Sequence, residues 1–98
     1  MHLLFTPMAA QDLEHIGDFI ARDNSSRAMS FVIEIEDQCK RICINPAGYV
    51  KRPELSPDIR SCAYGNYLIF FEIGTDVVTI IRILHGSRAL KYLLNPNQ

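Results

Sequence analysis

The stretch that decides the fold is RSCAYGNYLIFFEIGTDVVTIIRILHGSRAL, residues 60–90. Residues 67–73 and 77–85 are rich in β-branched and aromatic side chains, and a glycine-containing loop separates them. Residues 60–64 precede them across Gly65-Asn66, a two-residue turn whose residues tolerate positive φ. The stretch therefore predicts three consecutive antiparallel strands, a β-meander.

Both faces of the predicted meander carry apolar side chains. If neither loop hides a bulge, Tyr64 lies opposite Tyr67 and Ile73 opposite Val77, and alternate residues share a face. One face then takes Tyr67, Ile69, Phe71, Ile73, Val77, Thr79, Ile81, Ile83 and His85 with Arg60, Cys62 and Tyr64. The other takes Leu68, Phe70, Val78, Ile80 and Leu84 with Ser61, Ala63, Glu72 and Arg82. An antiparallel sheet in a small protein normally leaves one face exposed to solvent. An apolar second face therefore predicts a binding surface for another polypeptide.

A strand and two helices are predicted ahead of the meander. Residues 2–6 have the pattern of a short strand, and Thr6-Pro7 then supplies an N-cap and a proline at the first helical position. The first helix is expected over residues 7–22 and the second over residues 26–44, where Asn45-Pro46 ends it. Asp23-Asn24-Ser25, between the two helices, is a turn with N-cap chemistry. The expected inward residues are Ala9, Leu13, Ile16 and Ile20 in the first helix, and Ala28, Phe31, Val32, Ile35, Cys39 and Ile42 in the second. Gln11, Asp12, Glu14 and Asp18 are expected mostly on the opposite side of the first helix.

These elements predict an α+β fold with two layers and the order βααβββ. The N-terminal helical hairpin packs on a mainly antiparallel sheet, and residues 1–98 form a single domain. A loop with three prolines, residues 45–59, enters the sheet. It is either held in place by Tyr49 and Leu55 or mobile and functional.

Composition excludes several classes of function. A formal net charge of -1 gives no general attraction to nucleic acid or to anionic membranes, although Arg52, Arg60, Arg82 and Arg88 leave a local basic patch open. No apolar run reaches the roughly 18 residues of a membrane span, and the N-terminus has no export signal, so a cytoplasmic protein is expected.

The three cysteines predict buried core residues. Cys39, Cys43 and Cys62 are odd in number and lack CxxC spacing, which argues against a disulfide framework and against a structural zinc site. No metal ion or other cofactor is predicted.

Nearly the whole chain resembles the toxins of the RelE/ParE superfamily, the toxic halves of bacterial type II toxin-antitoxin pairs. The similarity is clearest in Asp12-Leu13 with Ile16, Asn45-Pro46, Arg52-Pro53 with Ile59-Arg60, Gly65-Asn66-Tyr67 with Ile69-Phe70-Phe71, and residues 81–88. Of the two main branches the chain is more similar to ParE, whose closing strand typically runs into His-Gly-x-Arg. Here that string is His85-Gly86-Ser87-Arg88.

The resemblance implies a toxin that inhibits DNA gyrase without being an enzyme. Toxins of the ParE type are neutralised by an antitoxin that wraps an extended C-terminal segment around them. The expected partners are therefore a cognate antitoxin, in a hetero-oligomer, and DNA gyrase. The residues expected to contact the target or the antitoxin are Arg60, Tyr64, Leu68, Phe70, Arg82, His85 and Arg88.

Two alternatives follow from the same resemblance. RelE-type toxins are ribosome-dependent mRNA endoribonucleases, and cleavage through the 2′-hydroxyl needs proton-transfer groups and cations around the phosphate. The candidate catalytic set is Arg60, Arg82, His85 and Arg88. Only Arg88 aligns convincingly with a RelE functional arginine, which favours the non-enzymatic interpretation. The third hypothesis is a non-toxic member that binds an antitoxin and acts as a co-repressor.

Each candidate residue also has a purely structural interpretation. His85 could hydrogen-bond the backbone of the following turn, and Arg60 and Arg82 could pair with Glu72, Asp58 or another carboxylate. Arg88 and Lys91 could belong to a solvated tail. If Phe70 faces the antitoxin, replacing it by Asp is expected to weaken that complex.

Overall fold

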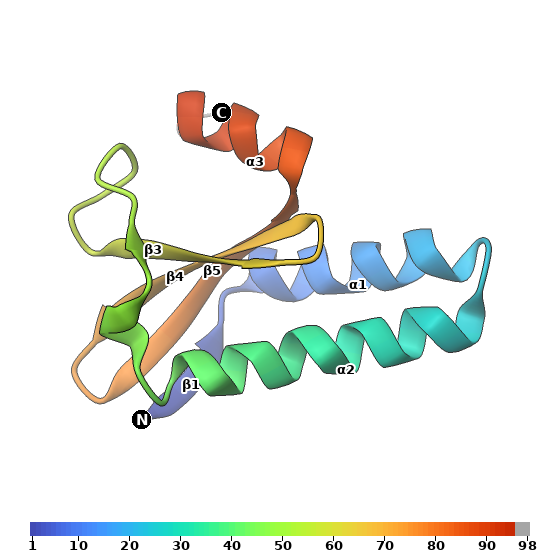
Figure 1. Cartoon of the computed structure of the whole chain (residues 1–98), viewed down its shortest axis with the longest axis horizontal. Coiled ribbons are helices and arrows are strands. Elements are labelled where there is room, and N and C mark those ends of the chain that lie inside the picture. The colour runs from blue at the N-terminus through green and yellow to red at the C-terminus, as the bar shows by residue number, and fades with distance from the viewer. Residues whose placement is uncertain (96–98) are drawn as a thin grey trace.

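A single five-stranded sheet organises the molecule, with the strand order β1-β5-β4-β3-β2 (Figure 1). The computed structural model describes residues 1–95. Its strands are β1 (His2–Phe5), β2 (Val50–Lys51), β3 (Ile59–Tyr64), β4 (Tyr67–Gly74) and β5 (Val77–His85). Its helices are α1 (Pro7–Ala21), α2 (Ser25–Ile42), the 3₁₀ turn η1 (Pro46–Gly48) and α3 (Gly86–Leu94). The expected α+β fold, with its βααβββ order and helical hairpin, is confirmed, while α3 and the short strand β2 are additions.

The helical hairpin begins where the caps predict. Thr6 accepts a hydrogen bond from the Ala9 amide at 3.0 Å, and its hydroxyl donates to the Ile81 carbonyl at 2.8 Å. Asn24 caps α2 by accepting from the Arg27 amide at 3.0 Å. Both predicted helices are therefore confirmed, with bounds shifted by one or two residues at their ends.

One core lies between the hairpin and the sheet. It contains Ala9 and Ile16 of α1, and Phe31, Ile35, Cys39 and Ile42 of α2, packed on β3, β4 and β5. These helix residues follow the spacing that the sequence predicts for an inward stripe. Asp12, which was expected on the solvent side of α1, is instead 5% exposed.

The predicted register of the last two strands is wrong along their whole length, by one residue next to the loop and by two residues beyond a bulge. The loop between them is Thr75-Asp76, with Asp76 at φ 57°, so Gly74 pairs with Val77 and Ile73 with Val78. A bulge then shifts the register between Phe70 and Phe71, which adds one residue to β5.

The shorter loop exchanges side chains between the two faces of the sheet over the part of β5 next to it, and the bulge restores the expected faces beyond it. Val78 and Ile80 pack in the core under the hairpin, and Ile81 packs on the opposite face, the reverse of the prediction. Ile83 and Leu84, which follow the bulge, lie on the expected faces. The register of β3 with β4, including Tyr64 opposite Tyr67, is confirmed.

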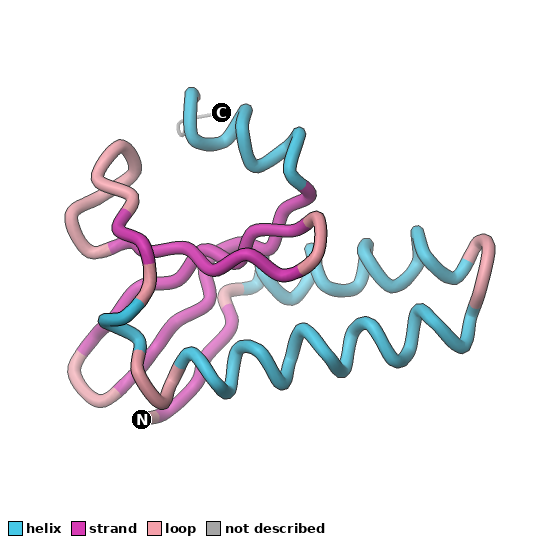
Figure 2. Tube along the Cα trace, in the orientation of Figure 1, coloured by secondary structure: helices cyan, strands magenta, loops and turns pink. Residues whose placement is uncertain are grey.

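The second face of the sheet is covered by α3, the chain's own C-terminal helix (Figures 1 and 2). A second cluster forms there from Ile59, Phe70, Leu84 and Ala89, with Leu55, Leu68, Ile81, Tyr92 and Leu93 packed against it. The prediction that another polypeptide must cover this face is therefore wrong for the area under α3. The segment with Arg88 and Lys91 is a helix rather than a tail.

The proline-containing loop is held to the body at two points. Tyr49 packs against the first core, with its ring edge-on to Phe71 at 5.7 Å, and Leu55 packs in the second cluster. Of the two predicted alternatives, the structure supports the loop that is pinned by these residues.

The turn after β3 depends on glycine. Gly65 has φ +57°, although an added Cβ would only meet Phe31 at ordinary contact distance, 3.8 Å. Gly65→Ala is therefore expected to lower the free energy of unfolding by about 1–2 kcal/mol through backbone strain alone. Urea unfolding would measure this, with Gly86→Ala as control, because Gly86 shows no positive φ. Equal losses in both variants would contradict the conformational explanation.

Candidate functional site

Three of the predicted site residues gather where β5 runs into α3. Arg82 lies near the end of β5, His85 is its last residue, and Arg88 is in the first turn of α3. Arg82 and Arg88 line a groove of about 630 Å³ with Leu84, Lys91, Tyr92, Leu94 and Asn95. This groove is called the α3 groove below.

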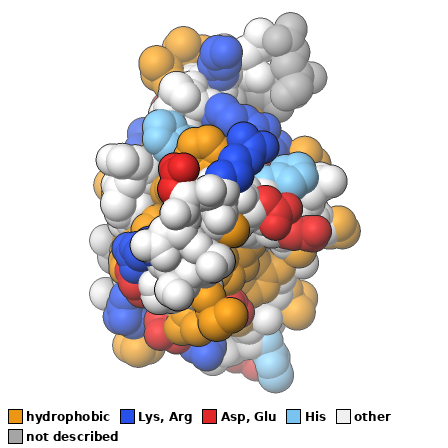
Figure 3. Space-filling view, turned by 90° about the vertical axis from the view of Figure 1, so that its right-hand side faces the viewer, with side chains coloured by type: hydrophobic (Ala, Val, Ile, Leu, Met, Phe, Trp, Pro, Cys, Tyr) orange, Lys and Arg blue, Asp and Glu red, His pale blue; other side chains and the backbone are white. Residues whose placement is uncertain are grey.

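A second hollow lies on the other side of the same junction. It has a volume of about 510 Å³ and is called the α1–α3 cleft. Its lining residues are Asp12, His15, Ile16, Asp18, Phe19, Arg22, Tyr67, Ile83, His85, Ser87 and Arg88. Arg88 is therefore shared between the two hollows, and His85 belongs to the cleft. Lys, Arg and His side chains gather beneath α3 in the view toward the tip of the helical hairpin (Figure 3).

Arg82 is held by a mostly buried carboxylate. Its Nε and Nη2 donate to the two oxygens of Asp12 at 2.7 and 3.0 Å, and the Asp12 carboxylate also accepts from the Ile83 amide at 2.9 Å. The two side chains are 13% and 6% exposed. The hydrogen bond to Asp12 raises the pKa of Arg82. This bidentate pair closes the edge of β5 beyond Ile80, where pairing with β1 stops.

His85 is exposed and packs on an aromatic ring. It stands edge-on to Tyr67 with ring centroids 5.3 Å apart, and it makes no side-chain hydrogen bond that would cap α3. The following turn is fixed instead by the Gly86 amide, which donates to the Asn66 carbonyl at 2.8 Å. The predicted bond from His85 to the backbone of this turn is thus replaced by a backbone contact.

Arg60 lies away from the junction. It donates to the carbonyls of Ala47 and Tyr49 at 3.3 and 2.9 Å and so fastens the proline-containing loop. It is opposite Phe71, whereas His85 is opposite Tyr67. Four residues of strand separate these positions by about 13 Å along β4. Arg60 is therefore not part of one site with His85.

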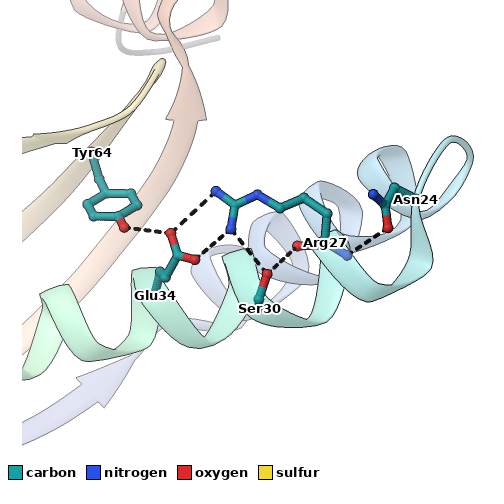
Figure 4. A network of polar contacts seen from close by, with 5 residues as sticks. All are labelled: Asn24, Arg27, Ser30, Glu34 and Tyr64. Carbon is teal, nitrogen blue, oxygen red and sulfur yellow. Dashed lines mark hydrogen bonds and ion pairs between the residues drawn. The ribbon is translucent and has the colours of Figure 1, made fainter.

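Tyr64 belongs to a polar network that joins β3 to α2 (Figure 4). Its hydroxyl donates to Glu34 at 2.7 Å, and Arg27 donates to the same carboxylate. The Arg27 and Tyr64 hydrogen bonds lower the pKa of Glu34. The stability that this network adds is therefore present above the ordinary pKa of Glu34 and is lost as the pH falls through the lowered value.

The two apolar site candidates differ in exposure. Leu68 is half-buried and lines a shallow hollow beside Gly86 and His85. Phe70 is fully buried beneath α3, with its ring 5.2 Å from that of Tyr92. A partner can therefore reach Leu68 directly but can reach Phe70 only if α3 moves.

The similarity to known proteins decides the family. Residues 3–90 match the family described as the ParE toxin of the type II toxin-antitoxin system, parDE. The chain belongs to the ParE toxin family. Comparison with curated proteins gave no match.

A solved structure of the same kind has a similar fold. The chromosomal ParDE toxin-antitoxin system from P. aeruginosa contains a chain that superposes with a TM-score of 0.73 and 25% sequence identity. The match covers 87% of this chain and 95% of that chain. The fold of this ParE family member is therefore shared over most of both chains.

Two further properties of this ParE family member concern metals and membranes. Burial raises the pKa of the Cys39 thiol to about 12, and burial also raises those of Cys43 and Cys62, which disfavours the thiolate that a metal would need. Within residues 1–95, three or more His, Cys, Asp or Glu side chains do not converge as metal ligands. In the same part of the chain, every helix is too short or too polar to cross a bilayer.

Sequence reasoning missed three residues of the α1–α3 cleft of this ParE family member. His15 and Phe19 of α1 and its C-cap residue Arg22 recur at spacings of four and three and so face one direction. They form a second stripe beside the core stripe. Phe19 is 63% exposed, and an aromatic residue in a second helical stripe is the pattern that could have revealed it.

Proposed function

We propose that this chain is the toxin of a type II toxin-antitoxin pair, that it inhibits DNA gyrase, and that a cognate antitoxin neutralises it. The observation that carries the proposal is the ParE family match over residues 3–90. The closing string His85-Gly86-Ser87-Arg88, which is similar to that of ParE-type toxins, supports it.

The arrangement of charges supports an inhibitor over a ribonuclease. A nuclease needs cations free to stabilise the phosphate in the transition state, together with proton-transfer groups within reach. The Arg82 guanidinium is paired with the Asp12 carboxylate, so it is not free to bind a phosphate. The Arg60 guanidinium donates to two loop carbonyls, far from His85. Only His85 and Arg88 of the candidate catalytic set are exposed and line the same hollow.

A gyrase assay tests the proposal. The purified toxin is expected to inhibit supercoiling by DNA gyrase, and to leave translated mRNA without codon-linked cuts in a primer-extension experiment. Codon-linked cuts that vanish in Arg88→Ala would instead establish the ribonuclease alternative. A chain that binds its antitoxin but causes neither effect, and no growth defect, would be the co-repressor.

The outer face of the helical hairpin offers a surface for the antitoxin. A groove of about 510 Å³ runs along it, lined by Phe5, Ala10, Leu13, Glu14, Gly17, Asp18, Val32 and Glu36. Beside it, β1 is the edge strand of the sheet, and Leu4 on this strand is 55% exposed. An edge strand next to an apolar groove suits an extended segment with alternating apolar and charged residues.

Obstructing this groove is expected to weaken the antitoxin complex. Ala10 is exposed and lines the groove, so the longer side chain in Ala10→Arg would enter it without disturbing the core. We expect at least roughly tenfold weaker binding in an interferometry or calorimetry titration with the antitoxin encoded beside this chain. Ala21→Arg, on the exposed last turn of the same helix, is the matched control. If both variants bind as the wild type does, the antitoxin docks elsewhere.

A further inference from the structure

The α1–α3 cleft is built from two elements that face each other. His15, Phe19 and the C-cap residue Arg22 line it from the side of α1, and Tyr67, His85 and Arg88 come from the sheet and α3. His15 and Arg22 are seven residues apart, which is about 10 Å at the helical rise of 1.5 Å per residue.

Positive charge in the cleft is available for a ligand. The guanidinium groups of Arg22 and Arg88 make neither an ion pair nor a hydrogen bond with any of residues 1–95. Asp12 is occupied by Arg82 and the Ile83 amide, which leaves Asp18 as the opposing carboxylate of the lining. Lys91 continues the positive charge into the neighbouring α3 groove.

Aromatic rings are interleaved with these cations. Phe19 is 63% exposed, and the Arg22 guanidinium carbon lies 5.8 Å from the centre of its ring. Across the cleft, Tyr67 and His85 form the edge-on pair. Phe19 belongs to neither core cluster, and its exposed ring beside a cation suits a ligand that has both a flat face and negative charge.

We propose that the α1–α3 cleft binds the phosphodiester backbone of a nucleic acid. Arg22 and Arg88 pair with phosphate oxygens, for which planar guanidinium groups are well suited, and Phe19 offers a stacking surface to an unpaired base. The site adds a nucleic-acid contact to the gyrase inhibition proposed above and does not depend on it. DNA held by a gyrase and messenger RNA are the two sources of such a ligand.

An acidic peptide fits the cleft less well. Its carboxylates would pair with the arginines, but they have no π face for Phe19. Nucleic acid uses both features, because every base has a π face and every linkage carries a charge.

A salt-dependent titration of the full chain tests this site. Fluorescence anisotropy with short labelled duplex DNA, single-stranded DNA and single-stranded RNA is compared at about 50 and 200 mM salt. Two phosphate contacts predict a roughly tenfold loss of affinity over this range. The labelled nucleic acid that binds most tightly identifies the source of the ligand.

Two sets of variants separate charge from stacking. The double variant Arg22→Ala/Arg88→Ala is expected to flatten the slope of log affinity against log salt by about 2. Phe19→Ala is expected to weaken binding to single strands by at least about fivefold and to leave the slope unchanged. Lys40→Ala/Lys51→Ala removes the same charge from exposed positions outside the cleft and should keep the wild-type slope.

Any one of three results would contradict the proposal that this cleft binds nucleic acid. These are no saturable signal with any of the nucleic acids, the same slope in both double variants, and competition by polyglutamate as effective as that by DNA. Circular dichroism melting would show that the variants are folded. Because the titration contains no gyrase, its outcome is separate from that of the supercoiling assay.

Discussion

Asp12→Ala is expected to lower the free energy of unfolding by about 3 kcal/mol, the lower end of the range for breaking a buried ion pair. The variant leaves the Arg82 guanidinium mostly buried without its carboxylate, and it also leaves the Ile83 amide at the strand edge without its acceptor. Urea unfolding followed by circular dichroism gives the change from the midpoint and slope.

The control for this variant lies on the same helix. Asp18→Ala removes an exposed carboxylate and is expected to change stability by no more than about 0.5 kcal/mol. Asp12→Ala/Arg82→Met should regain part of the loss, because no unpaired charge remains while the Ile83 amide stays unsatisfied. A loss of equal size in Asp12→Ala and Asp18→Ala would show that the ion pair contributes little.

Phe70→Ala is expected to cost about 3–5 kcal/mol, because Phe70 is fully buried between the sheet and α3. The variant loses the ring contact with Tyr92 and leaves a cavity beneath α3. Thermal melting and urea unfolding would both detect a loss of this size. Phe70→Asp, expected from the sequence to weaken the antitoxin complex if Phe70 faces that partner, should destabilise the toxin itself before any partner is added.

Leu90→Ala is the matched control on the outer side of α3. Leu90 is 58% exposed, so its truncation should change stability by less than about 0.5 kcal/mol. If Phe70→Ala were as mild as Leu90→Ala, α3 would not be packed on the sheet. Hydrogen exchange of the α3 amides would then be fast in the wild-type chain also.

Much of the fold could be predicted from local patterns. The hairpin followed from one apolar stripe on each helix and from caps at Thr6 and Asn24. The register of β3 with β4 followed from a two-residue turn. The β5 register failed because both faces of the strand are apolar, so a shift by one residue still buries apolar side chains. Alternation alone could not reveal the bulge at Phe70 and Phe71.

The helix α3 lacked the usual start signals. His85 at its N-cap makes no capping bond, and its first turn has no acidic residue. The inward spacing of Ala89, Tyr92 and Leu93 was the available indication. The candidate site was predicted in part: Arg82, His85 and Arg88 do gather at one junction. The buried partner of Arg82 was not found, because pairing across the sequence is set by tertiary structure alone.

The parallel pairing of β1 with β5 delays completion of the sheet during synthesis. His2 pairs with Val77 and Phe5 with Ile80, so the first strand that is synthesised cannot pair until the last strand has been synthesised. At the usual 5–20 residues per second, about 75 residues take roughly 4–15 s to polymerise. Until then the sheet lacks its first strand, and the growing chain exposes apolar surface that a chaperone or an early partner can hold.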